Sequence, residues 1–185
     1  MFTAKDVMAL REMSGAGMMD CKKALVECDG DMDKAMDYLR EKSLAASAKK
    51  ASRIAAEGVV SSYVSPDSKT GVIAEVNCET DFVAKTDDFK ALVDTVAKLV
   101  AEQDPQDVDA LMALDTGDGT VAEMITRAVA KIGEKITIRR FARSHVEGGM
   151  VDCYVHLGGK IGVLVEIACE DVAAAKPVAH DIAMH

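Results

Sequence analysis

The chain has 185 residues, of which 49% are hydrophobic and 29% are charged, and its formal net charge is −9. This length predicts one large domain or one domain with a small appendage, and the apolar content excludes a disordered chain. The negative charge argues against a broad nucleic-acid surface, since phosphate binding needs concentrated positive charge, although a local basic patch remains permitted.

Cysteine usage and the N-terminal residues indicate the compartment. The five cysteines form no CxxC pair and no zinc-ligand spacing, which favours a reduced protein whose thiols are small buried hydrophobes. The N-terminus has no signal-peptide stretch, and no apolar run is long enough to span a membrane. We therefore expect a soluble, cytoplasmic protein that does not contact a membrane.

Residues 1–44 predict a module of three short helices. Each helix places apolar residues at helical spacing. These residues are Val7, Leu10 and Met13 in the first helix, Met18, Cys21 and Leu25 in the second, and Met32, Ala35, Met36 and Leu39 in the third. Residues 45–56 are small and basic, and we expect a partly helical linker there.

An alternating pattern begins at Glu57 and predicts a hairpin of two strands, ending at Cys78. A helical stripe follows from Phe89 to Val100, and a second helix follows a polar stretch and opens with a T-x-x-E capping box, Thr120 and Glu123. A strand over residues 135–141 closes the unit. The predicted fold is α+β, with an antiparallel sheet backed by helices over residues 57–143.

A second hairpin in residues 144–185 repeats the first. Within residues 63–64 and 71–79, seven residues are identical to those 91 positions later, among them Tyr63 and Tyr154 at one end and Glu79 and Glu170 at the other. Two arbitrary hairpins would share alternation but not these identities. We therefore predict a duplicated α+β core whose second copy is incomplete, because it stops at His185 within its first helix. A truncated chain is the expectation.

Phe82 stands in the short connection between the first hairpin and the Phe89 helix, where polar residues are usual. It either packs beneath that helix or points outward to a partner. The second copy has Ala173 at the equivalent position. Because a shared packing role would predict a bulky residue in both copies, the comparison favours the outward position.

Motifs for catalysis and for metal or phosphate binding are weak or missing. Asp29, Asp31 and Asp33 resemble the start of a calcium loop, but the position that requires a bidentate glutamate is Arg40. No phosphate-binding loop or serine-hydrolase elbow occurs. A thiol enzyme with Cys78 as nucleophile and His156 as base can be imagined, but Cys169 repeats Cys78, which favours structural cysteines. We expect no enzyme, no metal and no cofactor.

Four stretches together resemble the bacterial translation elongation factor Ts family. They are residues 14–25 (SGAGMMDCKKAL), 76–85 (VNCETDFVAK), 130–134 (AKIGE) with 138–140 (IRR), and 181–185 (DIAMH). The resemblance runs from the first helix to the last residue. It implies a ubiquitin-associated-like three-helix module, a linker, and a core of two similar α+β subdomains. It also implies a guanine-nucleotide exchange factor for elongation factor Tu in protein biosynthesis.

The resemblance also assigns residues that contact elongation factor Tu. Asp81 and Phe82, flanked by Thr80 and Val83, match the family segment that enters the GTPase beside its magnesium site and promotes GDP release. Further contact positions match Met18, Met19, Lys22, Ile132, Gly133 and His156. One of the two methionines is expected in the core of the module.

The partner is expected to be bound both with GDP and free of nucleotide, without direct nucleic-acid contact, and a homo-oligomer is left open. Two alternatives are compatible with the sequence, a thiol enzyme and a plain peptide- or ubiquitin-binding module. The second would leave the duplicated core without a purpose.

Overall fold

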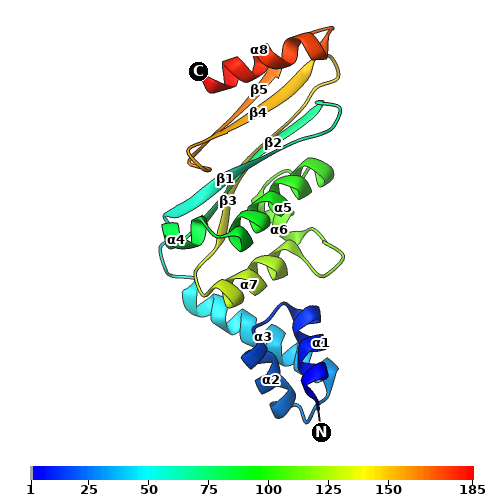
Figure 1. Cartoon of the computed structure of the whole chain (residues 1–185), viewed down its shortest axis with the longest axis vertical. Helices are drawn as coiled ribbons and strands as arrows, with labels where there is room; N and C mark the ends of the chain where they lie inside the picture. The colour runs from blue at the N-terminus through cyan, green and yellow to red at the C-terminus, as the bar shows by residue number, and fades with distance from the viewer. Residues whose placement is uncertain (1) are drawn as a thin grey trace. The chain divides into compact units, whose positions relative to one another are not determined.

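The structure is a computed structural model that describes residues 2–185 (Figure 1). They form two compact units, which we call the helical unit (the residues through Ile54, with Asp115–Ile136) and the sheet unit (Ala55–Leu114, with Thr137–His185). Within the described residues, no helix is both long enough and apolar enough to cross a membrane. The elements of the helical unit are α1 (Ala4–Ser14), α2 (Met18–Glu27), α3 (Met32–Lys50) and α7 (Val121–Ile132). Those of the sheet unit are β1 (Glu57–Val64), β2 (Thr70–Cys78), α4 (Asp81–Ala84), α5 (Asp87–Gln103), α6 (Val108–Ala113), β3 (Thr137–His145), β4 (Met150–His156), β5 (Ile161–Ile167) and α8 (Val172–Met184).

The three predicted N-terminal helices are present in the helical unit, and α3 continues to Lys50, through part of the predicted linker. Their shared core consists of Val7, Leu10, Cys21, Ala24, Leu25, Ala35 and Leu39. Met13 was expected in this core but is 56% exposed, which corrects the prediction. It lies in the last turn of α1, where the chain turns away through Gly15 in the left-handed conformation.

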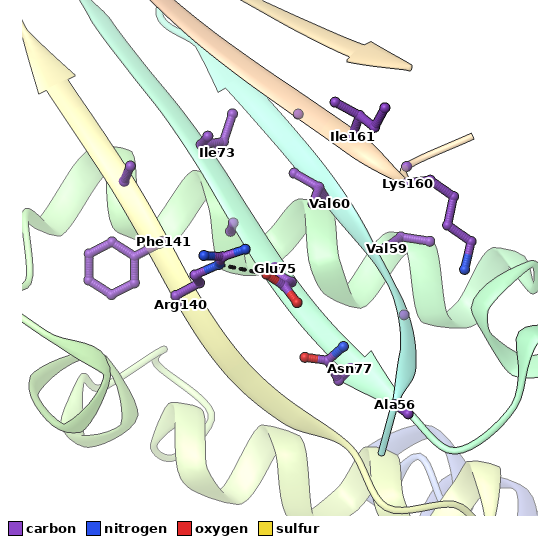
Figure 2. Close-up of a pocket in the computed structure, with 15 residues that line it drawn as sticks. Ala56, Val59, Val60, Ile73, Glu75, Asn77, Arg140, Phe141, Lys160 and Ile161 are labelled. Atoms are coloured by element: carbon purple, nitrogen blue, oxygen red, sulfur yellow. Dashed lines mark hydrogen bonds and ion pairs between the residues drawn. The ribbon is translucent and has the colours of Figure 1, made fainter. Parts of the chain in front are cut away.

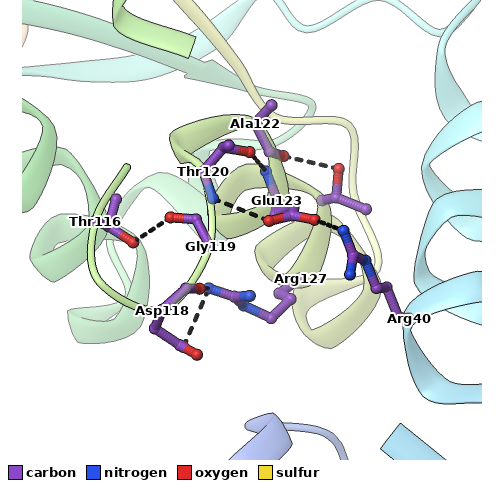
Figure 3. Close-up of polar contacts among 9 residues, drawn as sticks. Arg40, Thr116, Asp118, Gly119, Thr120, Ala122, Glu123 and Arg127 are labelled. Atoms are coloured by element: carbon purple, nitrogen blue, oxygen red, sulfur yellow. Dashed lines mark hydrogen bonds and ion pairs between the residues drawn. The ribbon is translucent and has the colours of Figure 1, made fainter. Parts of the chain in front are cut away.

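Helix α7 packs against α3 in the same unit, and its first turn is held by polar contacts (Figure 3). The predicted capping box is confirmed: the Thr120 amide donates to Glu123 Oε2 at 2.9 Å, and the Glu123 amide donates to Thr120 Oγ1 at 3.2 Å. The same carboxylate forms an ion pair with Arg40 of α3. These contacts, the Thr120 amide first, lower the pKa of Glu123.

The sheet unit contains an antiparallel sheet in the order β1-β2-β3 and a separate β4-β5 hairpin. Helix α5 covers one face of the three-stranded sheet, the hairpin packs on the other, and α8 covers the outer side of the hairpin (Figure 1). The predicted α+β fold is confirmed. Two short helices were not predicted: α6 in the polar stretch, and α4 in the connection after β2.

The two hairpins have equivalent strand registers. Tyr63 faces Val72 in the first copy, and Tyr154 faces Val163 in the second, so the 91-residue separation holds for the strand pairing as well as for the sequence. The predicted duplication of the hairpin is therefore visible in the backbone.

The hairpins also pack on each other reciprocally. The Val60 amide donates to the Gly159 carbonyl oxygen at 2.7 Å, and the Val151 amide donates to the Ser68 carbonyl oxygen at 2.8 Å. Val151 is the repeat equivalent of Val60, and Gly159 that of Ser68. Each contact thus has its counterpart with the copies exchanged, as in the interface of a two-fold symmetric dimer.

Two equivalent glycines permit this close approach. A Cβ on Gly71 would lie 2.3 Å from Val151 Cγ1, and a Cβ on Gly162 would lie 2.4 Å from Val60 Cγ1. Any larger residue would push the hairpins apart, which explains why both copies carry glycine at this position.

The equivalent cysteines of the two copies, Cys78 and Cys169, differ in burial. Cys78 is the last residue of β2 and is fully buried, whereas Cys169 lies beyond the end of β5 at Ile167 and is half-buried. Both cysteines were expected to be buried, and this prediction is correct only for Cys78. The physical reason is that β2 pairs with strands on both sides, while among the described residues β5 pairs only with β4.

Candidate functional site

The segment after β2 forms a single helical turn, α4, capped by Thr80, whose side chain accepts a hydrogen bond from the Val83 amide at 3.4 Å. The cap fixes which residues of the turn face the protein. Ala84 is turned inward and is 3% exposed, whereas Phe82 is turned outward and is 79% exposed. Burial in the fold therefore does not account for this aromatic residue.

Asp81 precedes Phe82 on α4 and is held ionised. The Lys85 ammonium donates to Asp81 Oδ2 at 2.6 Å, and this hydrogen bond is the main cause that lowers the pKa of Asp81, with smaller contributions from the charges of Lys85 and Lys160. Lys160 itself donates to Glu57 Oε2 at 2.6 Å, which raises its pKa. At neutral pH the surface thus presents a carboxylate beside an exposed ring.

Lys85 and Lys160 were not among the predicted site residues. The Asp81–Lys85 pair has the i, i+4 spacing of helical ion pairs, and this spacing was a signal available in the sequence. Lys160 had no such signal, because its approach to α4 depends on the packing of the second hairpin.

His156 ends β4 and is exposed at the tip of the second hairpin. Its Nδ1 lies 2.7 Å from the hydroxyl oxygen of Tyr154, which orients the imidazole ring. Lys160 lies in the turn that follows His156, and its positive charge contributes to the lowered pKa of Asp81 on α4. The structure therefore places His156 in the same unit as Asp81 and Phe82.

The other predicted contact residues lie in the helical unit. Met18 is 41% exposed, Met19 is 74% exposed, and Lys22 is exposed on the same helix, α2. The expectation that one of the methionines is core is wrong, because the inward face of α2 consists of Cys21, Ala24 and Leu25.

Ile132 and Gly133 form the C-terminal end of α7. Ile132 is half-buried, and Gly133 caps the helix with φ of 88°, its amide donating to the Val129 carbonyl oxygen at 3.0 Å. A glycine is needed here because the left-handed conformation disfavours side chains.

The structure does not support the thiol-enzyme alternative. Cys78 is fully buried, and its thiol donates to the Thr80 carbonyl oxygen at 3.2 Å. A nucleophile must be accessible to its substrate, and the proposed base, His156, is hydrogen-bonded to Tyr154.

Replacement of Cys78 by alanine provides a direct test. We expect a modest loss in the free energy of unfolding, of about 1 kcal/mol, because a small buried group is removed from the end of β2. If the chain has the exchange activity that the family resemblance implies, the rate of GDP release from elongation factor Tu, measured with a fluorescent nucleotide, should stay within about twofold of the rate with the unmodified chain. Abolished activity in a variant that melts normally would restore the enzyme interpretation.

The sheet unit also contains an open cavity of about 590 Å³ on the face of the three-stranded sheet, shown in Figure 2. Its wall includes Val60, Ile73 and the ion pair between Glu75 and Arg140, whose atoms lie 2.7 Å apart. None of the predicted site residues lines it, and its central charges are already paired. Across the described residues, no group of three or more histidine, cysteine or carboxylate side chains is arranged to hold a metal ion.

Comparisons with known proteins agree with these observations. The sequence profile described as "Elongation factor TS" matches residues 79–185. The chain is 56% identical over 185 residues to elongation factor Ts of Clostridium perfringens, covering 99% of this chain and 60% of that protein. It is 52% identical to elongation factor Ts of Clostridium novyi, and 52% identical to that of Nautilia profundicola, with 61% of each protein covered.

The chain thus spans about 60% of the length of the curated relatives that it matches. The profile covers more than half of the chain, and it includes α4 with the exposed Phe82. On these grounds, the chain belongs to the elongation factor Ts family.

Proposed function

We propose that this chain is a guanine-nucleotide exchange factor for elongation factor Tu in protein synthesis. The observation that carries the proposal is the exposure of Phe82, 79%, on a capped turn that ends with the buried Ala84. Exposing a large aromatic residue on a rigid turn has no benefit for folding, whereas such residues are the usual anchors of protein interfaces.

In the proposed mechanism, Asp81 and Phe82 enter the GTPase beside its magnesium site. Magnesium demands near-ideal octahedral geometry, so small displacements of its ligands on the GTPase weaken binding of the ion and of the diphosphate. The Phe82 ring supplies apolar area that is buried only when the magnesium ligands of the GTPase are displaced. Asp81, ionised through Lys85, adds a negative charge next to the site.

The exchange factor need only bind the nucleotide-free GTPase more tightly than the GDP-bound form. The two binding equilibria are linked. The exchange factor weakens the affinity of the GTPase for nucleotide by the same factor by which the nucleotide weakens the affinity of the GTPase for the exchange factor. This mechanism requires no covalent chemistry, in keeping with a protein that is not an enzyme and that acts in the cytoplasm without cofactor, membrane or nucleic acid.

The remaining predicted residues are proposed to stabilise the complex rather than to displace magnesium. Met18, Met19 and Lys22 form an exposed patch on α2, and Ile132 and Gly133 form the end of α7. His156, oriented by Tyr154, is proposed to contact the GTPase from the sheet unit.

The proposal is tested by mixing this chain with elongation factor Tu loaded with fluorescent GDP, in the presence of excess unlabelled GDP. We expect the release rate to rise with the concentration of the chain and then to saturate. Added EDTA, which removes magnesium directly, gives the rate of the magnesium-free complex for comparison. A release rate that stays at the spontaneous value, at concentrations where the two proteins co-elute, would contradict the proposal.

A further inference from the structure

We propose that Leu157, at the tip of the second hairpin, is a second apolar contact of the surface that carries Asp81 and Phe82. In this proposal its side chain enters an apolar depression on elongation factor Tu. The inference rests on the proposed exchange function and adds a residue to the same site.

The conformation of Leu157 is unfavourable for its residue type. Its φ is +50°, in the left-handed region that glycine and asparagine tolerate and that branched side chains disfavour. Its side chain is 68% exposed, so burial in the protein does not compensate for this backbone. An exposed leucine in a strained turn indicates a role outside the fold.

Comparison of the two copies leads to the same conclusion. The repeat equivalent of Leu157 is Pro66, in a turn where Asp67 Oδ1 accepts hydrogen bonds from Ser65 and from the amide of Lys69. Both turns make the same reciprocal backbone contact with the opposite hairpin, through Ser68 in one copy and through Gly159 in the other. The packing of the hairpins therefore does not require leucine at position 157.

Two contacts with β1 hold the tip close to α4. The Gly159 carbonyl oxygen accepts a hydrogen bond from the Val60 amide of β1 at 2.7 Å, and Lys160 pairs with Glu57 at the start of β1. Glu57 faces Cys78 in the strand register, and α4 begins three residues after Cys78, at Asp81. After the larger effect of Lys85, the charge of Lys160 also lowers the pKa of Asp81.

Phe82 and Leu157, at each of which one copy carries a large exposed apolar residue and the other does not, thus lie at the same edge of the sheet unit. Ile161, 50% exposed, lies at the end of the same turn. Two ion pairs lie at this edge, Asp81 with Lys85 and Glu57 with Lys160. An apolar centre with a paired polar rim fits a folded protein partner. An anionic membrane would instead require unpaired cations.

The substitution Leu157→Asn separates a binding role from a structural one. Asparagine tolerates the left-handed conformation, so we expect the melting temperature to be unchanged or higher. The concentration of the chain that gives half-maximal release of fluorescent GDP from elongation factor Tu should rise about fivefold or more, because an apolar interface contact is lost. Val178→Gln, at a residue 55% exposed on α8, is the matched control and should leave this concentration unchanged.

Two results would overturn the inference and leave the proposed function intact. One is a Leu157→Asn variant that reaches half-maximal GDP release at the same concentration as the unmodified chain, in an experiment where Phe82→Ala lowers the release rate. The other is a loss of binding that comes with a lower melting temperature, since this would show a structural role. If the unmodified chain does not accelerate GDP release from elongation factor Tu, the proposed function is wrong, and the inference that rests on it is wrong as well.

Discussion

Replacing Phe82 by alanine is expected to lower the maximal rate of stimulated GDP release at least about tenfold, since an interface anchor contributes about 2 kcal/mol or more. The substitution should lower the maximal rate, because Phe82 is proposed to be buried in the GTPase only when the magnesium ligands are displaced. Stability should change little: the ring is 79% exposed, and surface substitutions stay within about ±0.5 kcal/mol. Fluorescent GDP release and thermal unfolding, measured on the same preparation, check both expectations.

Phe89 provides the matched control within the same segment. It is fully buried in the first turn of α5, and its truncation to alanine should cost about 3–5 kcal/mol in the free energy of unfolding. The two variants therefore separate an aromatic residue that serves binding from one that serves the core. The assignment of Phe82 to partner binding would be refuted by a Phe82→Ala protein that melts far below the unmodified chain. It would also be refuted by a variant that stimulates GDP release at the rate of the unmodified chain.

The duplication could be predicted from the sequence because it left identities at a constant spacing, and Tyr63 and Tyr154 do occupy equivalent places in their hairpins. The reciprocal packing could not be predicted. It depends on the approach of two hairpins, and Gly71 and Gly162 alone do not indicate which residues they will face. Local rules, such as the capping box of Thr120 and Glu123, were reliable because their partners are close in sequence.

Errors in the prediction arose where an apolar pattern extended beyond the core. Met13 and Met18 have the helical spacing of core residues, but both lie at helix ends where the neighbouring helices no longer cover them. Helix α4 was missed because a single turn has no periodicity, and its signal is only the cap at Thr80.

In the candidate site, too, some residues could be predicted from the sequence and others depend on tertiary packing. Phe82 was indicated by comparing the copies, and Asp81 and Phe82 by the family resemblance. Lys160 and Leu157, by contrast, belong to a turn that only tertiary packing brings to α4. The comparison of Leu157 with Pro66 was available in the sequence, but its meaning depended on the exposure and φ of Leu157. The domain boundaries proposed from the sequence, at residues 44, 56 and 143, remain a proposal.

The exposed patch on α2 leads to the second large expected effect. Met19 is 74% exposed and Lys22 lies one turn further along the same face, so both side chains are available to a partner. The double substitution Met19→Ser and Lys22→Ala should raise the concentration for half-maximal GDP release about tenfold, which corresponds to about 1.4 kcal/mol of binding free energy. The maximal rate should stay unchanged, because the patch is proposed to stabilise the complex and Phe82 to displace magnesium.

Point substitutions are preferable to removal of the N-terminal helices. Helix α3 packs against α7, and Arg40 pairs with Glu123, so a deletion would also uncover α7 and weaken its first turn. Met8→Ser, at a methionine 54% exposed on α1, is the matched control and should leave both the half-maximal concentration and the maximal rate unaltered. If the α2 variant lowers the maximal rate and leaves the half-maximal concentration unchanged, the patch acts in exchange itself. The separation of roles between the two units would then be wrong.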